Sequence, residues 1–368
     1  MRKRIITMTS MKKNKVILGL SGGVDSTAAA LILAEKGFDV TGLYFDVTPE
    51  AAASGEGRRR AEKAAEQLSI DFVYRDVSRD FEDIVIGDFC RQYGCGRTPN
   101  PCIVCNPEVK FRTLLEAADS LGAHYIATGH YADTFHDEGT GKWYIRKADN
   151  VRKDQSYMLY RLGQEAISRL LLPLSNVEDK EQVREMARAR ALENSEARDS
   201  QEICFIPEGD DYKEFLRRRG LRPPGGDFVD RDGNVLGQHG GILDFTIGQR
   251  KGLGIALGKP AFVTAIDSDT NRVVLGSNED LFRREIFSEE NVLTNESWLE
   301  DEGLTAKIRY ASKPAPVRLE RVGDDRIKAC FDEPQRAATP GQSIVFYKDD
   351  LVVGGGFIAS RGKKEDSR

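Results

Sequence analysis

One glycine-rich stretch near the start of the chain, residues 19–26, has the composition of an anion site. It reads Gly-Leu-Ser-Gly-Gly-Val-Asp-Ser. The apolar residues 15–18 before it predict a buried strand, and the alanine- and leucine-rich residues 27–34 after it predict a helix. Glycines at such a junction let backbone N–H groups approach an anion, and the helix dipole favours negative charge there. The stretch therefore predicts a phosphate site with serine hydroxyls as further donors.

This loop differs from two better-known phosphate loops. A Walker loop ends in Gly-Lys-Ser/Thr, and residues 19–26 contain no lysine. The three-glycine spacing of a Rossmann fold is also absent. The remaining pattern, Ser-Gly-Gly-Val-Asp-Ser at residues 21–26, resembles the PP-loop of ATP pyrophosphatases. That resemblance implies cleavage of ATP to AMP and pyrophosphate, with adenylation of a substrate oxygen. An ordinary glycine turn is the alternative, but it needs one glycine and not a six-residue match.

The cysteines are the second set of residues that could act in catalysis or bind a metal. Four of the six fall in one stretch broken by glycine and proline: Cys90, Cys95, Cys102 and Cys105. Cys204 follows in Asp-Ser-Gln-Glu-Ile-Cys-Phe at residues 199–205, and Cys330 lies in an alternating strand pattern, where a buried small apolar role is the simplest interpretation. In a reducing compartment such cysteines are typically catalytic or metal-bound and not paired in disulfides.

Alternating strands and helices must position these residues. Strands are predicted at residues 39–45, 71–74 and 124–130, and helices at residues 57–69, 81–93 and 109–121. This alternation predicts a parallel, doubly wound sheet, whose ligands lie beyond the carboxyl ends of the strands. The glycine loop and the turn at Gly129 and His130 should therefore share one crevice, which Phe45 should border.

The second half of the chain has a different texture. Helical patterns continue at residues 156–171 and 179–191, and hairpins are then predicted around the turns 231–234 and 267–271. From about residue 286 strands dominate, at residues 306–310, 315–319, 326–331, 342–347 and 352–358.

The predicted fold class is therefore α/β: a doubly wound parallel-sheet PP-loop domain, a small mostly-β central domain and a C-terminal antiparallel β-barrel. The expected boundaries are 12–206, 207–285 and 286–360, with flexible tails at 1–11 and 361–368.

Composition limits the class of protein. The 368 residues are 40% hydrophobic and 31% charged, which is typical of globular domains with a core. No apolar run approaches the ~20 residues needed to span a bilayer, so we expect a cytoplasmic protein with no membrane partner. A net charge of −5 argues against nucleic-acid binding through bulk charge, although a local basic face on one domain is compatible with it.

Seven stretches together resemble the tRNA-specific 2-thiouridylase family. They are residues 19–26, 98–106, 127–131, 153–157, 199–205, 246–254 and 307–310, and they occur in the family's order over nearly the whole chain. This collinearity is stronger evidence than any single motif.

The resemblance implies a set of binding residues. ATP, with Mg2+ inferred from its chemistry, would be held by Gly19, Leu20, Ser21, Gly22, Gly23, Val24, Asp25, Ser26, Phe45 and Gly129. The target base would face Asn100, Pro101 and Cys102. The tRNA would contact His130, Lys153, Asp154, Gln155, Arg309, Tyr310 and Gln342.

The resemblance also implies the reaction, 2-thiolation of the wobble uridine of tRNA. Because oxygen is a poor leaving group, ATP would first adenylate the C2 oxygen, and sulfur would then displace AMP. Cys204 would carry a persulfide received from a donor, either a cysteine desulfurase or a relay protein. Cys105 would attack Cys204 to release the sulfur, or act on the activated base. A thiolate is strongly nucleophilic once its pKa is lowered, which suits both roles.

One departure from the family pattern concerns a metal. Typical members carry Asp-x-x-Cys where this chain has Cys102-x-x-Cys105. Cys102, Cys105 and Cys204 could then ligate a [4Fe–4S] cluster, as in related tRNA thiolases. Cys-x-x-Cys is also a common zinc spacing, and Cys90 and Cys95 could instead complete a four-cysteine zinc site with Cys102 and Cys105. Cys102 as a spectator thiol is the simplest alternative. The persulfide route is our preferred hypothesis, followed by the cluster and then by zinc.

Two other functions remain open on the sequence alone. Another PP-loop ATP pyrophosphatase would need no paired thiols. A zinc-bearing, nucleotide-binding RNA adaptor would release no pyrophosphate with tRNA and ATP.

Overall fold

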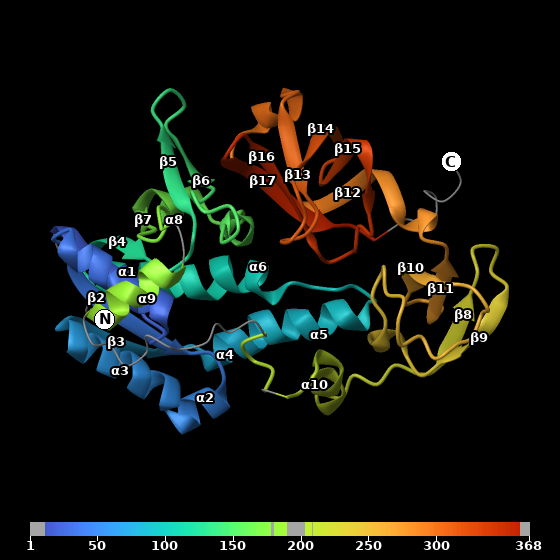
Figure 1. Ribbon diagram of the computed structural model, residues 1–368, viewed down its shortest axis with the longest axis horizontal. Coiled ribbons are helices and arrows are strands. Elements are labelled where there is room, and N and C mark those ends of the chain that lie inside the picture. The colour runs from blue at the N-terminus through green and yellow to red at the C-terminus, as the bar shows by residue number, and fades with distance from the viewer. Residues whose placement is uncertain (1–11, 178–179, 190–202, 208, 361–368) are drawn as a thin grey trace, which may run out of the picture. The chain divides into compact units, whose positions relative to one another are not determined.

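The computed structural model describes residues 12–177, 180–189, 203–207 and 209–360 (Figure 1). The expected tails 1–11 and 361–368, and residues 199–202 of the cysteine motif, lie outside the described residues. The chain divides into two compact units, Met1–Ile84 with Val104–Gln201, and Val85–Ile103 with Glu202–Arg368.

A parallel sheet organises the first unit. In the described residues it has five strands in the order β3-β2-β1-β4-β7, so the chain winds outward from β1 in both directions. Strand β1 pairs in parallel with β2 (Ile17 with Thr41) and with β4 (Ile17 with Ile126). The strands are β1 (Lys12–Gly19), β2 (Asp39–Asp46), β3 (Asp71–Asp76), β4 (Ala123–Ala127) and β7 (Leu170–Leu171).

Helices cover this sheet. Val16 and Leu18 of β1 share an apolar core with Ala28 of α1, whereas the alternate residue Gly19 lies against the Leu114 side chain of α7. Both faces of the central strand are therefore buried. The helices of this unit are α1 (Val24–Glu35), α2 (Pro49–Ser54), α3 (Glu56–Leu68), α4 (Ser78–Phe81), α7 (Arg112–Leu121), α8 (Gln164–Arg169) and α9 (Lys180–Ala189), with the π-helix η2 (Asn106–Phe111).

Two parts of the first unit differ from the sequence-based expectation. The helical pattern expected over residues 156–171 is confirmed only in part: a 3-10 turn, η3 (Ser156–Leu159), is followed by α8 and then by the strand β7. Gly163, with extended backbone (ψ 162°), separates the two helical pieces, and β7 pairs with the edge of β4 instead of continuing the helix. A hairpin formed by β5 (Asp133–Asp137) and β6 (Lys142–Arg146) was not predicted.

Along the chain, the second unit begins with helical segments that interrupt the first unit. These are α5 (Gly87–Gly94), preceded by the π-helix η1 (Glu82–Ile86), and α6 (Pro101–Cys105); η1 and α6 straddle the division between the units. Further along the chain comes α10 (Tyr212–Arg218).

A small sheet follows α10. It has the order β10-β11-β8-β9 and is built from two hairpins, and Phe228, Phe245 and Val263 lie at its core. Its strands are β8 (Gly226–Val229), β9 (Val235–His239), β10 (Phe262–Asp267) and β11 (Arg272–Gly276), with the 3-10 turn η5 (Ile242–Asp244). Both predicted hairpins are confirmed.

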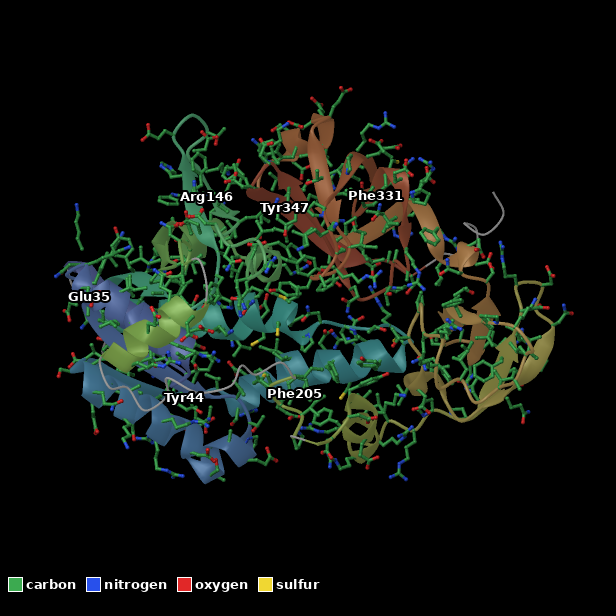
Figure 2. All side chains as sticks on the ribbon, in the orientation of Figure 1. Glu35, Tyr44, Arg146, Phe205, Phe331 and Tyr347 are labelled. Carbon is green, nitrogen blue, oxygen red and sulfur yellow. The ribbon has the colours of Figure 1, made fainter. Side chains whose placement is uncertain are left out.

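The end of the described chain forms a closed antiparallel barrel. The order β12-β15-β14-β13-β16-β17 closes because β12 also pairs with β17. Phe331 and Tyr347, labelled in Figure 2, are buried in this barrel. Its strands are β12 (Phe282–Leu293), β13 (Leu304–Lys307), β14 (Ala315–Val322), β15 (Arg326–Arg336), β16 (Ser343–Lys348) and β17 (Leu351–Ile358), with the 3-10 turns η6 (Glu279–Leu281) and η7 (Glu296–Glu300). The predicted fold class is confirmed in all three parts.

One barrel strand is shorter than predicted. The expected strand 306–310 ends at Lys307, because Arg309 and Ser312 form a turn in which the Ser312 N–H donates to the Arg309 carbonyl at 3.1 Å. Within the described residues, no helix combines the length and the apolar character that crossing a bilayer requires.

Candidate active site

The glycine loop between β1 and α1 depends on Gly22. Its φ is +74°, in the left-handed region that favours glycine, and a Cβ here would lie 2.9 Å from the backbone of Arg60 and Ala61 in α3. Gly23 then caps α1 with extended backbone (φ −81°, ψ 162°). The loop can therefore turn sharply against α3 and present the N-terminal N–H groups of a 12-residue helix.

Hydroxyl groups hold the loop in shape. Ser26 Oγ donates to the Gly23 carbonyl at 3.1 Å and accepts from the Ser21 N–H at 3.2 Å. The buried Thr27 hydroxyl also donates to the Gly23 carbonyl, at 2.9 Å. These bonds make the loop preorganised, since its backbone is fixed without help from a ligand.

The end of β4 lies against the same loop. A Cβ on Gly129 would be 3.0 Å from the backbone of Asp25 and Ser26, and the Tyr131 hydroxyl donates to Asp25 Oδ1 at 2.8 Å. The first unit thus brings Gly129 to the glycine loop, as the strand order predicts. Tyr131 was not singled out from the sequence, although it directly follows the Gly-His pair.

Phe45 lies at the same edge of the sheet. Strand β2 pairs with β1 as far as Leu43 opposite Gly19, so Phe45 stands two residues beyond the level at which the loop begins. Its side chain is half-buried. The residues expected to hold ATP therefore all lie within one unit, at the carboxyl ends of β1, β2 and β4.

His130 is a neutral side chain in this setting. Burial, aided by the positive charge of Lys110, lowers the pKa of His130 to about 3. Its Nδ1 lies 2.8 Å from Thr128 Oγ1, and its ring stacks on Phe111 with centroids 6.1 Å apart. A neutral imidazole offers one donor and one acceptor, so contact of His130 with RNA would be a hydrogen bond and not an ion pair.

The expected target-base residues start helix α6. Asn100 Oδ1 accepts from the Cys102 N–H at 3.2 Å, and Pro101 occupies the first helical position. This is the arrangement of an N-cap followed by proline. Cys102 is exposed and Cys105 half-buried. Three residues apart on one helical turn, the two thiols lie on the same face of α6.

A π-helical segment, η2, continues directly from Cys105. It begins at Asn106, whose side-chain amide donates to the Met158 carbonyl at 2.8 Å, and contains Pro107, which has no N–H to donate. Such segments are frequent at functional sites.

Cys204 is exposed beside an aromatic anchor. The neighbouring Phe205 is buried, and its ring centroid lies 5.2 Å from that of Phe89 in α5 and 5.3 Å from that of Phe215 in α10 (Figure 2). Phe205 thereby fixes the backbone next to the thiol.

The expected tRNA-contact residues at 153–155 have partners inside the first unit. The carboxylate of the buried Asp154 accepts from the Ala148 N–H at 3.2 Å and from the Ser156 hydroxyl at 2.9 Å. Gln155 Oε1 accepts from the Tyr131 N–H, and the Gln155 N–H donates to the Tyr131 carbonyl. Lys153 Nζ lies over the Tyr131 ring, 6.0 Å from its centroid.

The three expected tRNA-contact residues of the second unit belong to the barrel region. Arg309 and Tyr310 are exposed in the turn after β13, and Arg309 Nη2 donates to the Arg336 carbonyl at 2.7 Å. Gln342 precedes β16, and its Nε2 donates to the Thr98 carbonyl at 2.8 Å.

A metal cluster finds no ready site in the described part of the chain. No three His, Cys, Asp or Glu side chains among these residues are grouped so as to hold a metal ion. No step is therefore derived through a [4Fe–4S] cluster or a four-cysteine zinc site.

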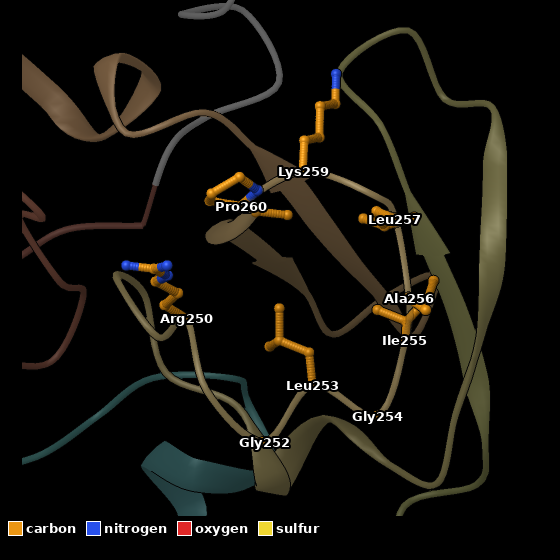
Figure 3. A pocket seen from close by; sticks show the side chains of 10 residues that line it. Arg250, Gly252, Leu253, Gly254, Ile255, Ala256, Leu257, Lys259 and Pro260 are labelled. Carbon is orange, nitrogen blue, oxygen red and sulfur yellow. The ribbon is translucent and has the colours of Figure 1, made fainter.

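A cavity of about 440 Å³ lies elsewhere, beside β10 (Figure 3). Arg250, Leu253 and Lys259 help to line it, and none of the expected catalytic, nucleotide, target-base or tRNA residues does.

Comparison with known proteins places the chain in a family. Three family models match in succession: the tRNA methyl transferase HUP domain over residues 14–208, the tRNA methyl transferase PRC-barrel domain over 213–277, and the aminomethyltransferase beta-barrel domain over 286–358. The chain is 43% identical over 354 residues to the tRNA-specific 2-thiouridylase MnmA of Clostridioides difficile, covering 94% of this chain and 98% of that protein. The chain belongs to the tRNA-specific 2-thiouridylase family.

Other members of the tRNA-specific 2-thiouridylase family are similar over the same length. MnmA 1 of Caldanaerobacter subterraneus is 44% identical over 362 residues, covering 95% of this chain and 98% of that protein. MnmA of Carboxydothermus hydrogenoformans is 43% identical over 366 residues, covering 96% of this chain and all of that protein. The resemblance stated from seven motifs is thus confirmed along the whole chain.

Proposed function

We propose that this chain is an ATP-dependent tRNA-uridine 2-sulfurtransferase that replaces the C2 oxygen of the wobble uridine by sulfur. Membership of the tRNA-specific 2-thiouridylase family carries uridine thiolation and the use of ATP. The near full-length similarity is the observation that carries the proposal. The finer steps rest on the chemistry of this chain's residues.

The first step is adenylation of the base. The C2 oxygen attacks the α-phosphorus of ATP, a P–O bond forms, and pyrophosphate leaves. N–H groups at the start of α1 would bind the phosphate oxygens, because Gly22 and Gly23 leave them accessible. Mg2+ on ATP would be held mainly by phosphates, with Asp25 as the carboxylate of the loop.

The second step replaces oxygen by sulfur. Cys204 receives the terminal sulfur of a persulfide from a donor protein, either a cysteine desulfurase or a relay protein. The Cys105 thiolate then attacks Cys204 Sγ, the Cys204 persulfide bond breaks, and hydrosulfide is released. Hydrosulfide attacks C2, and AMP leaves with the former C2 oxygen. The Cys105–Cys204 disulfide that results needs two electrons from a thiol reductant before the next turnover.

The expected division of labour follows from these steps. Residues 12–206 would activate the base, residues 207–285 would form a central module, and residues 286–360 would bind tRNA. We place the reaction in the cytoplasm, because a cycle that uses the side chains of residues 105 and 204 as thiols needs a reducing compartment.

A reconstituted assay tests this function. Protein, unmodified tRNA, ATP with Mg2+, a persulfide-loaded donor and a dithiol are combined, and tRNA nucleosides are measured by mass spectrometry alongside pyrophosphate. We expect 2-thiouridine with the unchanged protein and none with Cys105→Ser or Cys204→Ser. Cys330→Ser, a barrel cysteine outside the expected site, is the matched control and should keep full activity.

Each other outcome identifies a competing hypothesis. Activity in both serine variants would favour another PP-loop reaction, and absence of tRNA-dependent pyrophosphate would favour an adaptor. Loss of activity in Cys102→Ser, together with iron and sulfide in anaerobically purified protein, would favour the cluster route over the persulfide route.

A further inference from the structure

A turn of the barrel holds the segment that leads into the target-base residues. The Thr98 N–H donates to the Pro340 carbonyl at 2.9 Å, and Gln342 Nε2 donates to the Thr98 carbonyl at 2.8 Å. Both backbone polar groups of Thr98 are therefore bonded to the turn between β15 and β16. All of these residues belong to the second unit.

The preceding residue, Arg97, is fixed by the barrel strands. Its Nη2 lies 2.7 Å from Glu289 Oε1 in β12 and 3.2 Å from the carbonyl of Ile358 at the end of β17. The Arg97 and Glu289 side chains are only 17% and 22% exposed, so solvent screens this ion pair less than one on the surface.

Gly341 permits this close approach. Its φ is +87°, and a Cβ would lie 3.1 Å from both the Arg97 Cβ and the Thr98 nitrogen. Alanine here would meet both an unfavourable backbone conformation and a tight contact that Arg97 and Thr98 would have to relieve by a small shift. The Gly341 backbone thus lies close against Arg97 and Thr98, and it leaves little space for a side chain between them.

We term this contact the clasp; it joins Pro340, Gly341 and Gln342 to Arg97 and Thr98. We propose that the clasp positions the target-base residues. Asn100 follows Thr98 by two residues and caps the helix that carries Cys102. The barrel thereby fixes the position of the residues that begin α6. This role would be in addition to the expected contact of the barrel with tRNA. Gln342 acts as a positioning residue through Thr98. The role of residues 100–102 at the target base rests on the proposed function, whereas the clasp itself does not.

The first test replaces Gly341 by alanine. Gly323→Ala is the matched control, because Gly323 has φ +67° in the same barrel and nothing within 4 Å of its Cβ position. Amide hydrogen exchange of the peptide spanning residues 97–103 is measured without tRNA or ATP. We expect exchange at Thr98 to rise at least about tenfold in Gly341→Ala and to stay unchanged in Gly323→Ala.

Kinetics separate positioning from tRNA binding. In Gly341→Ala we expect kcat for thiolation to fall about tenfold, with KM for tRNA and the affinity for ATP within about twofold of the original. Unchanged exchange at Thr98, or a change confined to KM, would overturn the proposal.

A second variant covers the case in which Gly341→Ala does not fold. Gln342→Glu keeps the side-chain size but turns the donor facing the Thr98 carbonyl into an acceptor, so exchange at Thr98 should rise in the same way. Gln335→Glu is its control, because the Gln335 amide donates to the nearby Glu333 carbonyl in the same strand. If Gln342→Glu raises KM for tRNA without altering exchange, Gln342 contacts tRNA directly and the clasp has no positioning role. If the unchanged protein thiolates no tRNA, the proposed function fails while the exchange data still decide the clasp.

Discussion

Single polar side chains in this protein often serve the fold where the sequence suggests a ligand. Asp154 and Gln155 lie in a motif expected to contact tRNA, yet the Asp154 carboxylate bonds to Ala148 and Ser156 and the Gln155 amide bonds to Tyr131. We propose that these bonds hold Lys153 in place for RNA. A motif reveals that a residue type is needed at a position, but it does not reveal which atom the side chain bonds.

The half-buried His130, whose ring nitrogens are shielded from water, gives a prediction about pH. Its pKa is about 3 in the folded protein, against an ordinary value of 6.5, so between these values the unfolded chain binds a proton that the folded chain does not. The stability that the neutral ring contributes is complete above about pH 6.5 and is lost as the pH falls toward 3. His130→Gln removes this dependence. The free energy of unfolding, measured with urea, should fall between about pH 7.5 and about pH 5. This fall should be smaller in the variant than in the original protein by about 2 kcal/mol. Equal drops would contradict a buried neutral ring.

At the level of elements, the glycine loop packs closely against α3 because Gly22 has no side chain. Gly22→Ala places a Cβ 2.9 Å from the α3 backbone, so the loop or the helix must shift. Gly37→Ala is the matched control, since Gly37 has φ +82° at the other end of α1 and nothing within 4 Å. We expect calorimetry to show ATP affinity at least about tenfold weaker in Gly22→Ala and unchanged in Gly37→Ala. Wild-type affinity in Gly22→Ala would mean that the loop does not bind the phosphates.

Elements with a strong local signal were predictable, and those decided by distant partners were not. The strand, glycine loop and helix of residues 12–35 follow from local pattern alone. The helical pattern expected at residues 156–171 ends early because Leu170 and Leu171 gain strand partners from β4, which the local sequence does not contain. The clasp is likewise invisible in sequence, since Thr98 and Gln342 meet only in the folded unit.

For the molecule as a whole, the order of its parts and the C-terminal barrel could be predicted, but the strand pairing that closes the barrel could not. Alternation of predicted strands and helices indicated the parallel sheet, and closely spaced strands indicated the barrel. Closure requires β12 to pair with both β15 and β17, through Ser288 opposite Ile327 and Ile358. No local pattern encodes that double pairing, because it depends on a strand that changes partners half-way along its length.

Overall charge bears on the proposed function, because that function requires a protein of net charge −5 to bind a polyanion. Binding must then depend on a local basic surface, such as the exposed turn that carries Arg309 in the barrel region. If Arg309 contacts a phosphate, Arg309→Gln should lower the slope of log affinity for tRNA against log salt concentration by about one, because one fewer counterion is released. Lys36→Gln makes the same change in net charge at the exposed end of α1, far along that helix from the glycine loop, and should leave the slope unaltered. Filter binding over a range of salt concentrations measures both slopes. Equal reductions in the two variants would show that tRNA responds to total charge and not to a surface on the barrel.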